Sequence, residues 1–351
     1  MFRVAEPEVA YVSLADLDPA AYAPYDDPRD FIQTWTDRIW IARGVGAIAD
    51  LYPPEVKVHT AYGETYSTAV TTANSLQKMV AFPNRGGGHD DVIWEPRGRT
   101  GFVSFHRVFN NATHGGTWTY GPPTGKQWMN RSVAHCLVRD GKIIEEWVVR
   151  DEYAVLEHLG LDPLQVATEL AERSPVLGGK IDLGGGAFAG RFPDPVVEGI
   201  SGRRPAAHEA ECRWLAGMFE ECWNGRLFDR LANYLADTVV CQTVRLRRVM
   251  QLAPYQLELM SLLSPFPDAT FEIRDIAAHL SPDLGLRIGV IWLLRGSYSG
   301  APVFGPTNNA PIAVLGASAF ELRRGRIVRE WRIYDEIAML AQIVAHAKRQ
   351  A

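Results

Sequence analysis

The sequence has no surplus of basic residues and few cysteines. Its 351 residues include 36 Lys or Arg and 41 Asp or Glu, which leaves a formal net charge of −5. Nucleic-acid binding needs a concentrated Lys/Arg surface that neutralises phosphates, so we expect no nucleic-acid partner. The four cysteines show no C-x-x-C spacing. This is typical of reduced thiols in a cytoplasmic protein rather than of a disulfide framework.

Long apolar runs and several enzyme motifs are also missing. No window reaches about 18 uninterrupted apolar residues, so we expect no membrane span. The first residues carry acids where a signal peptide needs a basic start and an apolar run. There is no G-x-G-x-x-G after a strand, no P-loop, no nucleophile elbow and no spacing of metal ligands. We therefore expect neither a metal nor an organic cofactor.

The chain does contain a long internal repeat. The segment GKIIEEWVVRDE starts at Gly141, and GRIVREWRIYDE starts 184 residues later at Gly325. Six of the twelve positions are identical, and further matches at almost the same offset, such as Trp40 with Trp223, extend the repeat to a whole domain. We predict an N-terminal extension at 1–25, a first domain at 26–165, a Gly/Pro-rich linker at 166–205 and a second domain at 206–351.

Both copies place their expected elements in the same order. Apolar residues at helical spacing over 29–52 and 207–236 come first, each followed by a short strand and a second helix. Long strands follow, and each copy closes with a helix, at 152–159 and 336–347. The strands are expected at 101–109, 116–120, 127–139 and 142–151, and at 271–279, 286–298, 312–323 and 326–335. Helices followed by an antiparallel meander indicate an α+β fold.

The repeated hairpin carries a Trp and an Asp on one face of its second strand. Because side chains alternate along a strand, Trp147 and Asp151 point to the same side. A tight turn at Asp140-Gly141 would set Trp147 opposite Ala134 and Asp151 opposite Asn130. A small residue opposite a large ring leaves room for a cavity, so we expect Trp147 on its floor.

Two interpretations of Asp151 are open. A carboxyl at the end of an apolar face lies in a medium of low dielectric, where its pKa rises and it can pass protons near neutral pH. Alternatively, Asp151 caps the helix that follows, because Asp is a preferred N-cap residue.

The distribution of histidines favours chemistry in the first copy. Six of the nine lie there, and the second copy replaces three of them, His59, His106 and His135, with Gln242, Val290 and Ala319. Each histidine taken alone is more often a packed core or edge residue. In an unbroken ladder His135 would lie on the face opposite Asp151. Only a β-bulge between the two would bring both into one cavity.

Residues 115–163 hold two motifs in succession. The turn GPPTGK runs from Gly121 to Lys126, and a D-G-K-I-x-E-x-W hairpin runs from Asp140 to Trp147. A terminal L-x-x-L-G helix closes the segment. Together these residues resemble the SnoaL-like polyketide cyclase family of the NTF2-like superfamily. The second copy resembles it more weakly, because it keeps the hairpin but has GPTNNAP in place of the turn.

This resemblance implies two cone-shaped α+β barrels, each a curved antiparallel sheet wrapped by helices around one apolar pocket. Family members usually pair as dimers, so a fused tandem looks like a pseudo-dimer in one chain, and a further homo-oligomer stays open. In the cyclases an Asp on the last strand and a His on the preceding strand perform acid–base chemistry, which corresponds to Asp151 and His135. The superfamily also contains non-catalytic binding proteins, so the fold leaves the function open.

The leading hypothesis is a cofactor-independent cyclase, isomerase or lyase that acts on a small, largely apolar carbonyl compound in the first pocket. Asp151 would move a proton, and His135 or His106 would stabilise an enolate oxygen. The expected substrate-binding residues are His59, Trp35, Trp40, Tyr120, Asn130 and Trp147, and Trp331 and Asp335 would mark a second pocket. The alternatives are a non-catalytic ligand-binding or scaffolding protein, and a hydratase, dehydratase or hydrolase of a polar metabolite.

Overall fold

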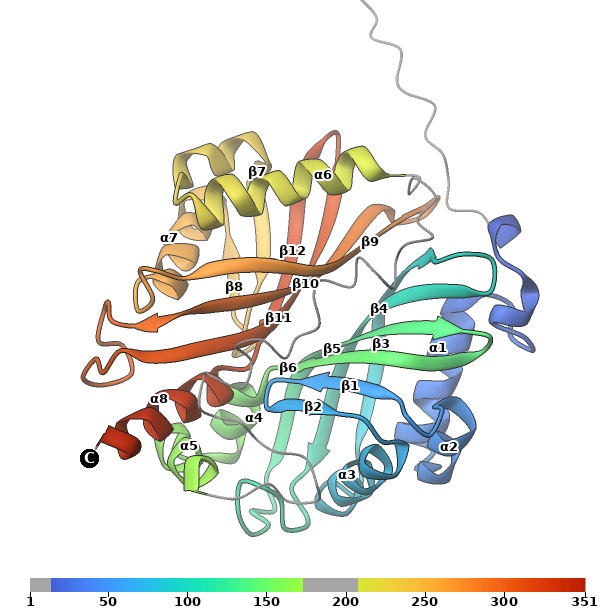
Figure 1. Ribbon diagram of the computed structural model, residues 1–351, viewed down its shortest axis with the longest axis horizontal. Helices are drawn as coiled ribbons and strands as arrows, with labels where there is room; N and C mark the ends of the chain where they lie inside the picture. Colours follow the sequence, from blue (N-terminus) through green and yellow to red (C-terminus); the bar gives the residue numbers. More distant parts are fainter. Residues whose placement is uncertain (1–13, 173–207, 351) are drawn as a thin grey trace, which may run out of the picture.

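Two six-stranded sheets, one from each half of the chain, form the framework (Figure 1). The structure is a computed structural model that describes residues 14–172 and 208–350. Most of the expected linker and the start of the N-terminal extension lie outside the described residues. The strand order is β2-β1-β6-β5-β4-β3 in the first sheet and β8-β7-β12-β11-β10-β9 in the second. The two orders correspond strand for strand, as a duplicated domain predicts.

The strands are long and antiparallel except where β1 and β7 run parallel to their neighbours β6 and β12. The first sheet consists of β1 Lys57–Thr60, β2 Gly63–Thr65, β3 Gly86–Pro96, β4 Gly101–Thr113, β5 Gln127–Arg139 and β6 Lys142–Arg150. The second consists of β7 Leu235–Gln242, β8 Arg248–Met250, β9 Thr270–Ser281, β10 Gly285–Tyr298, β11 Ala310–Arg323 and β12 Arg326–Tyr334.

Helices precede and follow the long strands in both halves. They are α1 Pro28–Thr36, α2 Ile48–Leu51, α3 Thr68–Ala81, α4 Glu152–Leu159, α5 Pro163–Glu172, α6 Glu209–Met218, α7 Leu252–Leu263 and α8 Glu336–Gln350. Short 3-10 turns lie at Leu14–Asp16, Pro19–Ala21, Val45–Ala47 and Phe228–Asn233, and π-helical turns extend α1 and α6 at Asp37–Ile41 and Phe219–Asn224. Within the described part of the chain, no helix is long and apolar enough to cross a membrane.

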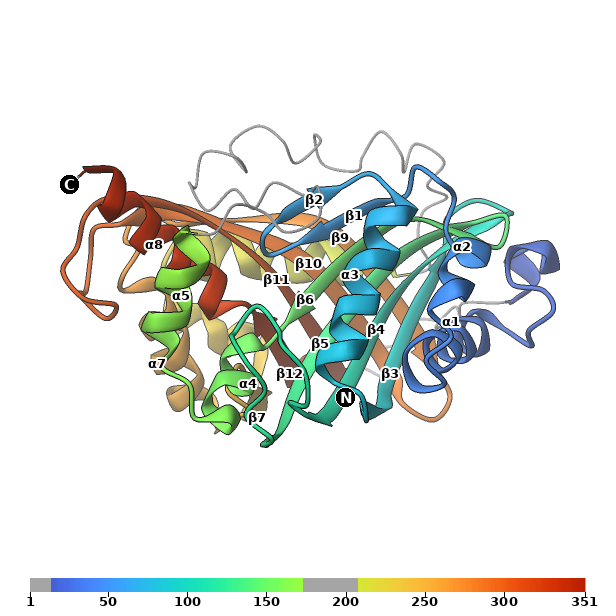
Figure 2. The same cartoon turned by 90° about the horizontal axis from the view of Figure 1, so that it is seen from below.

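The two sheets face one another, and helices cover their outer sides. Figures 1 and 2 show α1, α2 and α3 on the side of the first sheet that points away from the second. Between the sheets, Ile93, Phe105 and Trp147 of the first domain join Ile291 and Leu293 of the second in one apolar cluster. Both faces of each sheet are therefore buried, one against helices and one against the other domain.

A glycine permits close contact between the sheets. A Cβ atom on Gly289 would lie only 2.5 Å from Cγ of Phe105, far inside van der Waals distance. Phe105 pairs with His135, and Gly289 pairs with Ala319 in the equivalent ladder. Phe105 and Gly289 thus occupy the same position of the repeat and meet each other between the two domains.

The β5–β6 hairpin contains a β-bulge, which the sequence required if His135 and Asp151 were to lie on the same face of the sheet. The register shifts between Leu137 and Val138, so that His135, not Ala134, pairs with Trp147. The expected pairing of Ala134 with Trp147 is therefore wrong by one residue. The bulge does bring His135 onto the face of Trp147, because one extra residue in a strand reverses the alternation beyond it.

Two local expectations differ from the structure. Residues 116–120 form no strand, only an isolated bridge between Trp118 and Gly121 in a loop. Conversely, β3 was not expected, because its start, GGGHDD, lacks the alternation of apolar and polar residues that indicates a strand. Its glycines and acids lie at the end of an edge strand, where side chains are partly exposed and the pattern is weakest.

Candidate functional site

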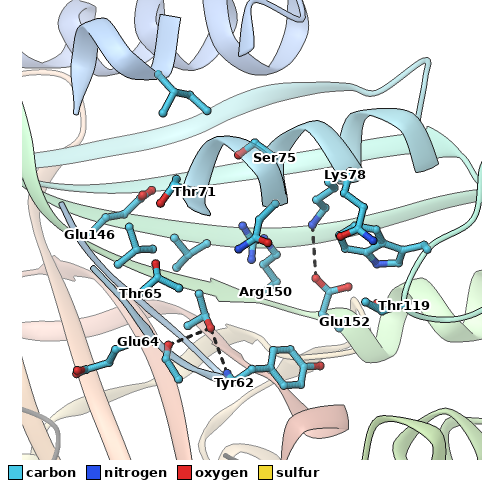
Figure 3. Close-up of a pocket in the computed structure, with 18 of the residues that line it drawn as sticks. Tyr62, Glu64, Thr65, Thr71, Ser75, Lys78, Thr119, Glu146, Arg150 and Glu152 are labelled. Atoms are coloured by element: carbon cyan, nitrogen blue, oxygen red, sulfur yellow. Dashed lines mark hydrogen bonds and ion pairs between the residues drawn. The ribbon is translucent and has the colours of Figure 1, made fainter. Parts of the chain in front are cut away.

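The first domain contains a cavity of about 250 Å³, partly open to solvent, between α3 and the inner face of its sheet (Figure 3). A smaller cavity of about 70 Å³ adjoins it. The two cavities are neighbours and share a wall formed by Trp40, Tyr52, Glu146, Val148 and Arg150.

The larger cavity has an apolar wall and a polar end. Its apolar wall is formed by Ile39, Trp40, Ile48, Val58, Val148 and Leu170. At the polar end Lys78, Arg150, Glu152 and Tyr120 converge from a helix, a strand, a helix start and a loop. Such a cavity suits a small molecule with a hydrocarbon body and one or two oxygen atoms.

Lys78 and Glu152 form the centre of the polar end. The Lys78 Nζ lies 3.6 Å from Glu152 Oε1, and the Tyr120 hydroxyl donates to the other Glu152 oxygen. Burial lowers the pKa of Lys78 to about 7, and the charge of Arg150 adds to this, while Glu152 opposes it. Burial alone would raise the pKa of Glu152, but Lys78, Arg150 and Tyr120 together hold it below its usual value.

Glu146 is a second acid in the same cavity. The Tyr52 hydroxyl donates to Glu146 Oε2 at 3.0 Å. Burial raises the pKa of Glu146 above its usual value, although Tyr52 and Arg150 oppose the rise. A carboxyl with a raised pKa is a stronger base than an ordinary glutamate once it is ionised.

Two arginines add positive charge. Arg150 projects from β6 between Glu146 and Glu152, and within residues 14–172 and 208–350 its guanidinium makes no hydrogen bond or ion pair (Figure 3). Arg85 donates to Asn110 Oδ1 and lies 4.6 Å from the centroid of the Trp40 ring. Burial lowers the pKa of Arg85 to about 9, and Arg150 adds to this effect. The site therefore has an unpaired cation available to a substrate.

Several residues predicted from the sequence do lie at the cavities. Trp40 and Tyr120 line the larger one, and Trp35 and His106 line the smaller one. Burial lowers the pKa of His106 to about 3, so this imidazole is neutral. Asn130 lies beside the site, where it accepts a hydrogen bond from Asn110 at 3.1 Å.

The other expected residues of the first pocket lie on the opposite face. Trp147 packs between the sheets, and the His59 ring stacks on it at 4.8 Å. The His135 Nε2 lies 2.7 Å from Asp275 Oδ2 of the second domain. The expectation that these side chains line the cavity is wrong, because 146, 148 and 150 point inward and the odd-numbered positions face the other sheet.

Asp151 is also outside the cavity, where it caps α4. One oxygen accepts from the Ala154 backbone N–H at 3.3 Å, and the other accepts from Leu246 N–H of the second domain. Burial raises the pKa of Asp151 to about 6 against the opposing effect of these N–H groups. The helix-capping interpretation of Asp151 is the one that the geometry supports.

Trp331 and Asp335, which were expected to mark a second pocket, have other surroundings. Trp331 lies at the interface, with the Arg107 guanidinium 3.8 Å from its ring centroid. Asp335 caps α8 by accepting from Ile337 and Ala338 N–H, and burial raises its pKa to about 8. Neither residue lines the two cavities of the first domain.

Large side chains occupy positions in the second domain that line a cavity in the first. Trp292 pairs with Gly316 at the positions that Val108 and Ser132 hold in the first domain, where both line the smaller cavity. A Cβ atom on Gly316 would lie 2.1 Å from the Trp292 ring, so the glycine makes room for the indole.

A buried ion pair occupies the remaining space. Arg332 corresponds to Val148, and its guanidinium contacts Glu330 at 2.7 Å. Glu330 in turn corresponds to Glu146. The acid that is free to react in the first domain is therefore neutralised in the second.

The important residues that sequence reasoning missed are Lys78, Glu146, Arg150 and Glu152. The structure, not the sequence, shows that Ser75 and Lys78 share the buried face of α3 with Met79. A polar residue on the buried face of a helix indicates a polar cavity rather than plain core. For a metal, the described residues offer no cluster of three or more His, Cys, Asp or Glu side chains.

The fold and one family match follow from these observations. The fold is a tandem of two α+β domains, each a six-stranded sheet with helices on one face, as predicted. Residues 214–343, within the second domain, match the family model described as SnoaL-like polyketide cyclase, which confirms the resemblance drawn from the sequence. No curated protein matches the chain.

Solved structures with a similar fold cover one domain at a time. IdmH, a putative polyketide cyclase from Streptomyces antibioticus, is 22% identical over 36% of this chain and 94% of its own, with a TM-score of 0.32. AclR, a putative hydroxylase from Streptomyces galilaeus, is 22% identical over 38% and 95%, with a TM-score of 0.34. A putative SnoaL-like polyketide cyclase from Jannaschia is 18% identical over 37% and 89%, with a TM-score of 0.33.

Proposed function

We propose that the chain is a cofactor-independent acid–base enzyme of the cyclase, isomerase or lyase type, and that it acts on a small carbonyl compound in the first domain. One observation carries this proposal: a carboxyl with a raised pKa, Glu146, lines the same cavity as the guanidinium of Arg150, which has no ion-pair partner among the described residues. The match of the second domain to a cyclase family supports it.

In this mechanism Glu146 removes a proton from the carbon next to the carbonyl group. Arg150 then stabilises the negative charge that develops on the substrate, because a cation held beside an apolar wall acts more strongly than one in bulk solvent. The apolar wall of Ile48, Val58 and Val148 holds the hydrocarbon part. At about 250 Å³ the cavity is smaller than most ligand pockets, which span roughly 300–1,000 Å³, so the substrate is small.

The proposal can be tested without knowing the natural substrate. A set of small ketones and β-keto esters is incubated with the full chain in D₂O, and exchange of α-protons is followed by proton NMR. Glu146→Gln keeps the shape but cannot accept the proton, so we expect exchange to slow by about 10²–10⁴-fold.

Glu145→Gln is the matched control, since Glu145 neighbours Glu146 on the strand but bonds His59 instead of lining the cavity. We expect this variant to retain exchange. Exchange by Glu146→Gln within about tenfold of the wild type would rule out Glu146 as the base. Saturable binding of a ketone with no exchange would favour a ligand-binding protein instead.

A further inference from the structure

We propose that Lys78 is an amine nucleophile that joins covalently to carbonyl compounds in the cavity and forms an iminium with them. This inference deepens the proposed function and rests on it, because it assigns the same cavity a covalent intermediate. It means that the substrates are ketones or aldehydes whose carbonyl carbon can reach the end of the Lys78 side chain.

The first support is the place of Lys78 in the fold. It lies in the last turn of α3, and its side chain is only 11% exposed. The amine points into the cavity toward Glu152 (Figure 3). A lysine that served only solubility would extend into solvent, since Lys is rarely buried without a charged partner or a function.

The second support is the balance of charge around the amine. Two guanidinium groups, those of Arg150 and Arg85, repel a proton on Lys78, whereas Glu152 attracts it. With burial, these effects bring the pKa of Lys78 to about 7, so roughly half of the molecules carry a neutral amine at that pH. Desolvation and neighbouring cations are the means by which proteins activate lysine nucleophiles.

The third support is an ionised acid beside the amine. One oxygen of Glu152 lies 3.6 Å from the Lys78 amine, and the other accepts a hydrogen bond from the Tyr120 hydroxyl. Its pKa stays below the usual value because Lys78, Arg150 and Tyr120 outweigh the effect of burial. Glu152 can therefore accept a proton from the ammonium form and return it later.

The steps balance without any added reagent. Glu152 takes one proton from the Lys78 ammonium, and the freed electron pair forms a C–N bond to the carbonyl carbon. The carbonyl oxygen gains a proton from the attacking nitrogen and becomes a hydroxyl. Glu152 returns its proton to this hydroxyl, the C–O bond breaks, and water leaves as the C=N bond forms. One ammonium and one carbonyl thus give one iminium and one water.

The iminium also explains why cations surround an acid–base site. A positive iminium next to Arg150 and Arg85 is destabilised by repulsion, so it loses an α-proton readily and becomes a neutral enamine. Glu146 is the carboxylate in the same space that takes this proton. The arginines thereby favour the step that the proposed function requires.

The test uses acetylacetone as the probe with the full chain. Addition of a neutral lysine amine to this diketone gives a conjugated enaminone, which is followed by near-ultraviolet absorption and located by peptide mass mapping. We expect one adduct per chain, on Lys78, in the wild type. Lys78→Arg keeps the charge but should show no adduct, and Lys126→Arg, which replaces a lysine bound to the Leu159 carbonyl, should react like the wild type.

The pH dependence distinguishes this amine from surface lysines. An amine with a pKa of about 7 gains about tenfold in reaction rate between pH 6 and pH 8, whereas an ordinary lysine gains about a hundredfold. Adduct on Lys78 with the shallow profile supports the proposal. The proposal is overturned if peptide mass mapping finds adducts on surface lysines only, or if the reaction rate at Lys78 rises about a hundredfold between pH 6 and pH 8. This measurement uses the wild-type chain, so it does not depend on the folding of a variant.

Deuterium exchange separates this proposal from the proposed function. If Lys78→Arg and Glu146→Gln both lose α-exchange, the iminium route is supported. If Lys78→Arg keeps exchange while Glu146→Gln loses it, the iminium is overturned and the acid–base function stands. If Glu146→Gln keeps exchange, the assignment of the base fails whatever happens at Lys78.

Discussion

Glu146 and Glu330 occupy the same position on β6 and β12, yet only Glu330 has an arginine two residues further along its strand. In the first domain that position is Val148, so the nearest strand cation is Arg150, which stays unpaired. The arginine at this position of the second domain holds Glu330 in an ion pair, whereas with valine there Glu146 lines the cavity with a raised pKa.

Asp335 predicts a pH dependence of stability. Its pKa is raised to about 8 by burial, with Glu152 adding to the rise, so the folded state binds this proton more tightly than the unfolded state does. The free energy of unfolding therefore falls as pH rises from the usual aspartate range to about 8. Asp335→Asn removes this loss and still caps α8, because Asn is an equally good N-cap.

We expect thermal melts to show Asp335→Asn gaining on the wild type steadily as the pH is raised from 5 to 8. Asp237→Asn, a change at an exposed position, should follow the wild type throughout. Parallel curves for Asp335→Asn and the wild type would show that this carboxyl ionises normally.

At the scale of elements, each domain ends its last strand with an Asp that caps the next helix and reaches the other domain. Asp151 accepts from Leu246 N–H in the β7–β8 turn, and Asp335 lies beside Tyr62 in the β1–β2 turn. These two contacts are equivalent in the repeat. The duplicated Asp is therefore explained by helix starts and domain contacts.

This explanation predicts that Asp151 is dispensable for catalysis. Asp151→Asn should retain α-proton exchange and most of the stability, because the amide oxygen can cap α4 as well as a carboxylate does. Asp151→Ala should lose about 0.5–2 kcal/mol in urea unfolding. Loss of exchange by more than a hundredfold in folded Asp151→Asn would return a direct role to this acid.

The repeat, the α+β class and most strands could be predicted, because turn residues and alternation are local signals. The sequence could not predict which side of β6 faces the cavity. Its sequence KIIEEWVVR places an acid and apolar residues on both faces. Both faces are buried, one in the cavity and one between domains, so polarity cannot separate them. The bulge at Leu137 and Val138 then changes the pairing with β5.

The residues of α3 show why the polar cluster of the cavity escaped prediction. The helix sequence TAVTTANSLQKMVA has no apolar stripe that would indicate which side faces inward. Lys78 becomes significant only when Glu152, 74 positions away, is known to lie beside it. Contacts between distant segments depend on the wrapping of the sheet, which no local pattern encodes.

At the scale of the whole molecule, the two domains are joined by a tightly packed interface. A substitution at Gly289 tests how tight this packing is. Gly289→Ala would force a Cβ atom into the Phe105 ring, so we expect a loss of about 1–3 kcal/mol. Phe105→Ala alone leaves a cavity and should cost about 3–5 kcal/mol.

The double variant gives the decisive measurement. Removal of the ring relieves the clash, so the combined loss in urea unfolding should be smaller than the sum of the two single losses. Gly296→Ala is a control, because its nearest neighbours are Ala269 and Asp268, far from the ring. Strict additivity of Gly289→Ala and Phe105→Ala would mean that the two sheets adjust freely.

The meeting of Phe105 with Gly289 also bears on the ancestry of the chain. Equivalent positions that touch across a two-fold interface must be the same residue when two copies of one chain associate. Here they are a phenylalanine and a glycine, and two copies of the first domain in this arrangement would press one benzyl ring into another. A single chain that holds both halves permits such a pair, because the two halves can then differ in sequence. Each half therefore needs the other half as its partner, and a second copy of itself would not fit.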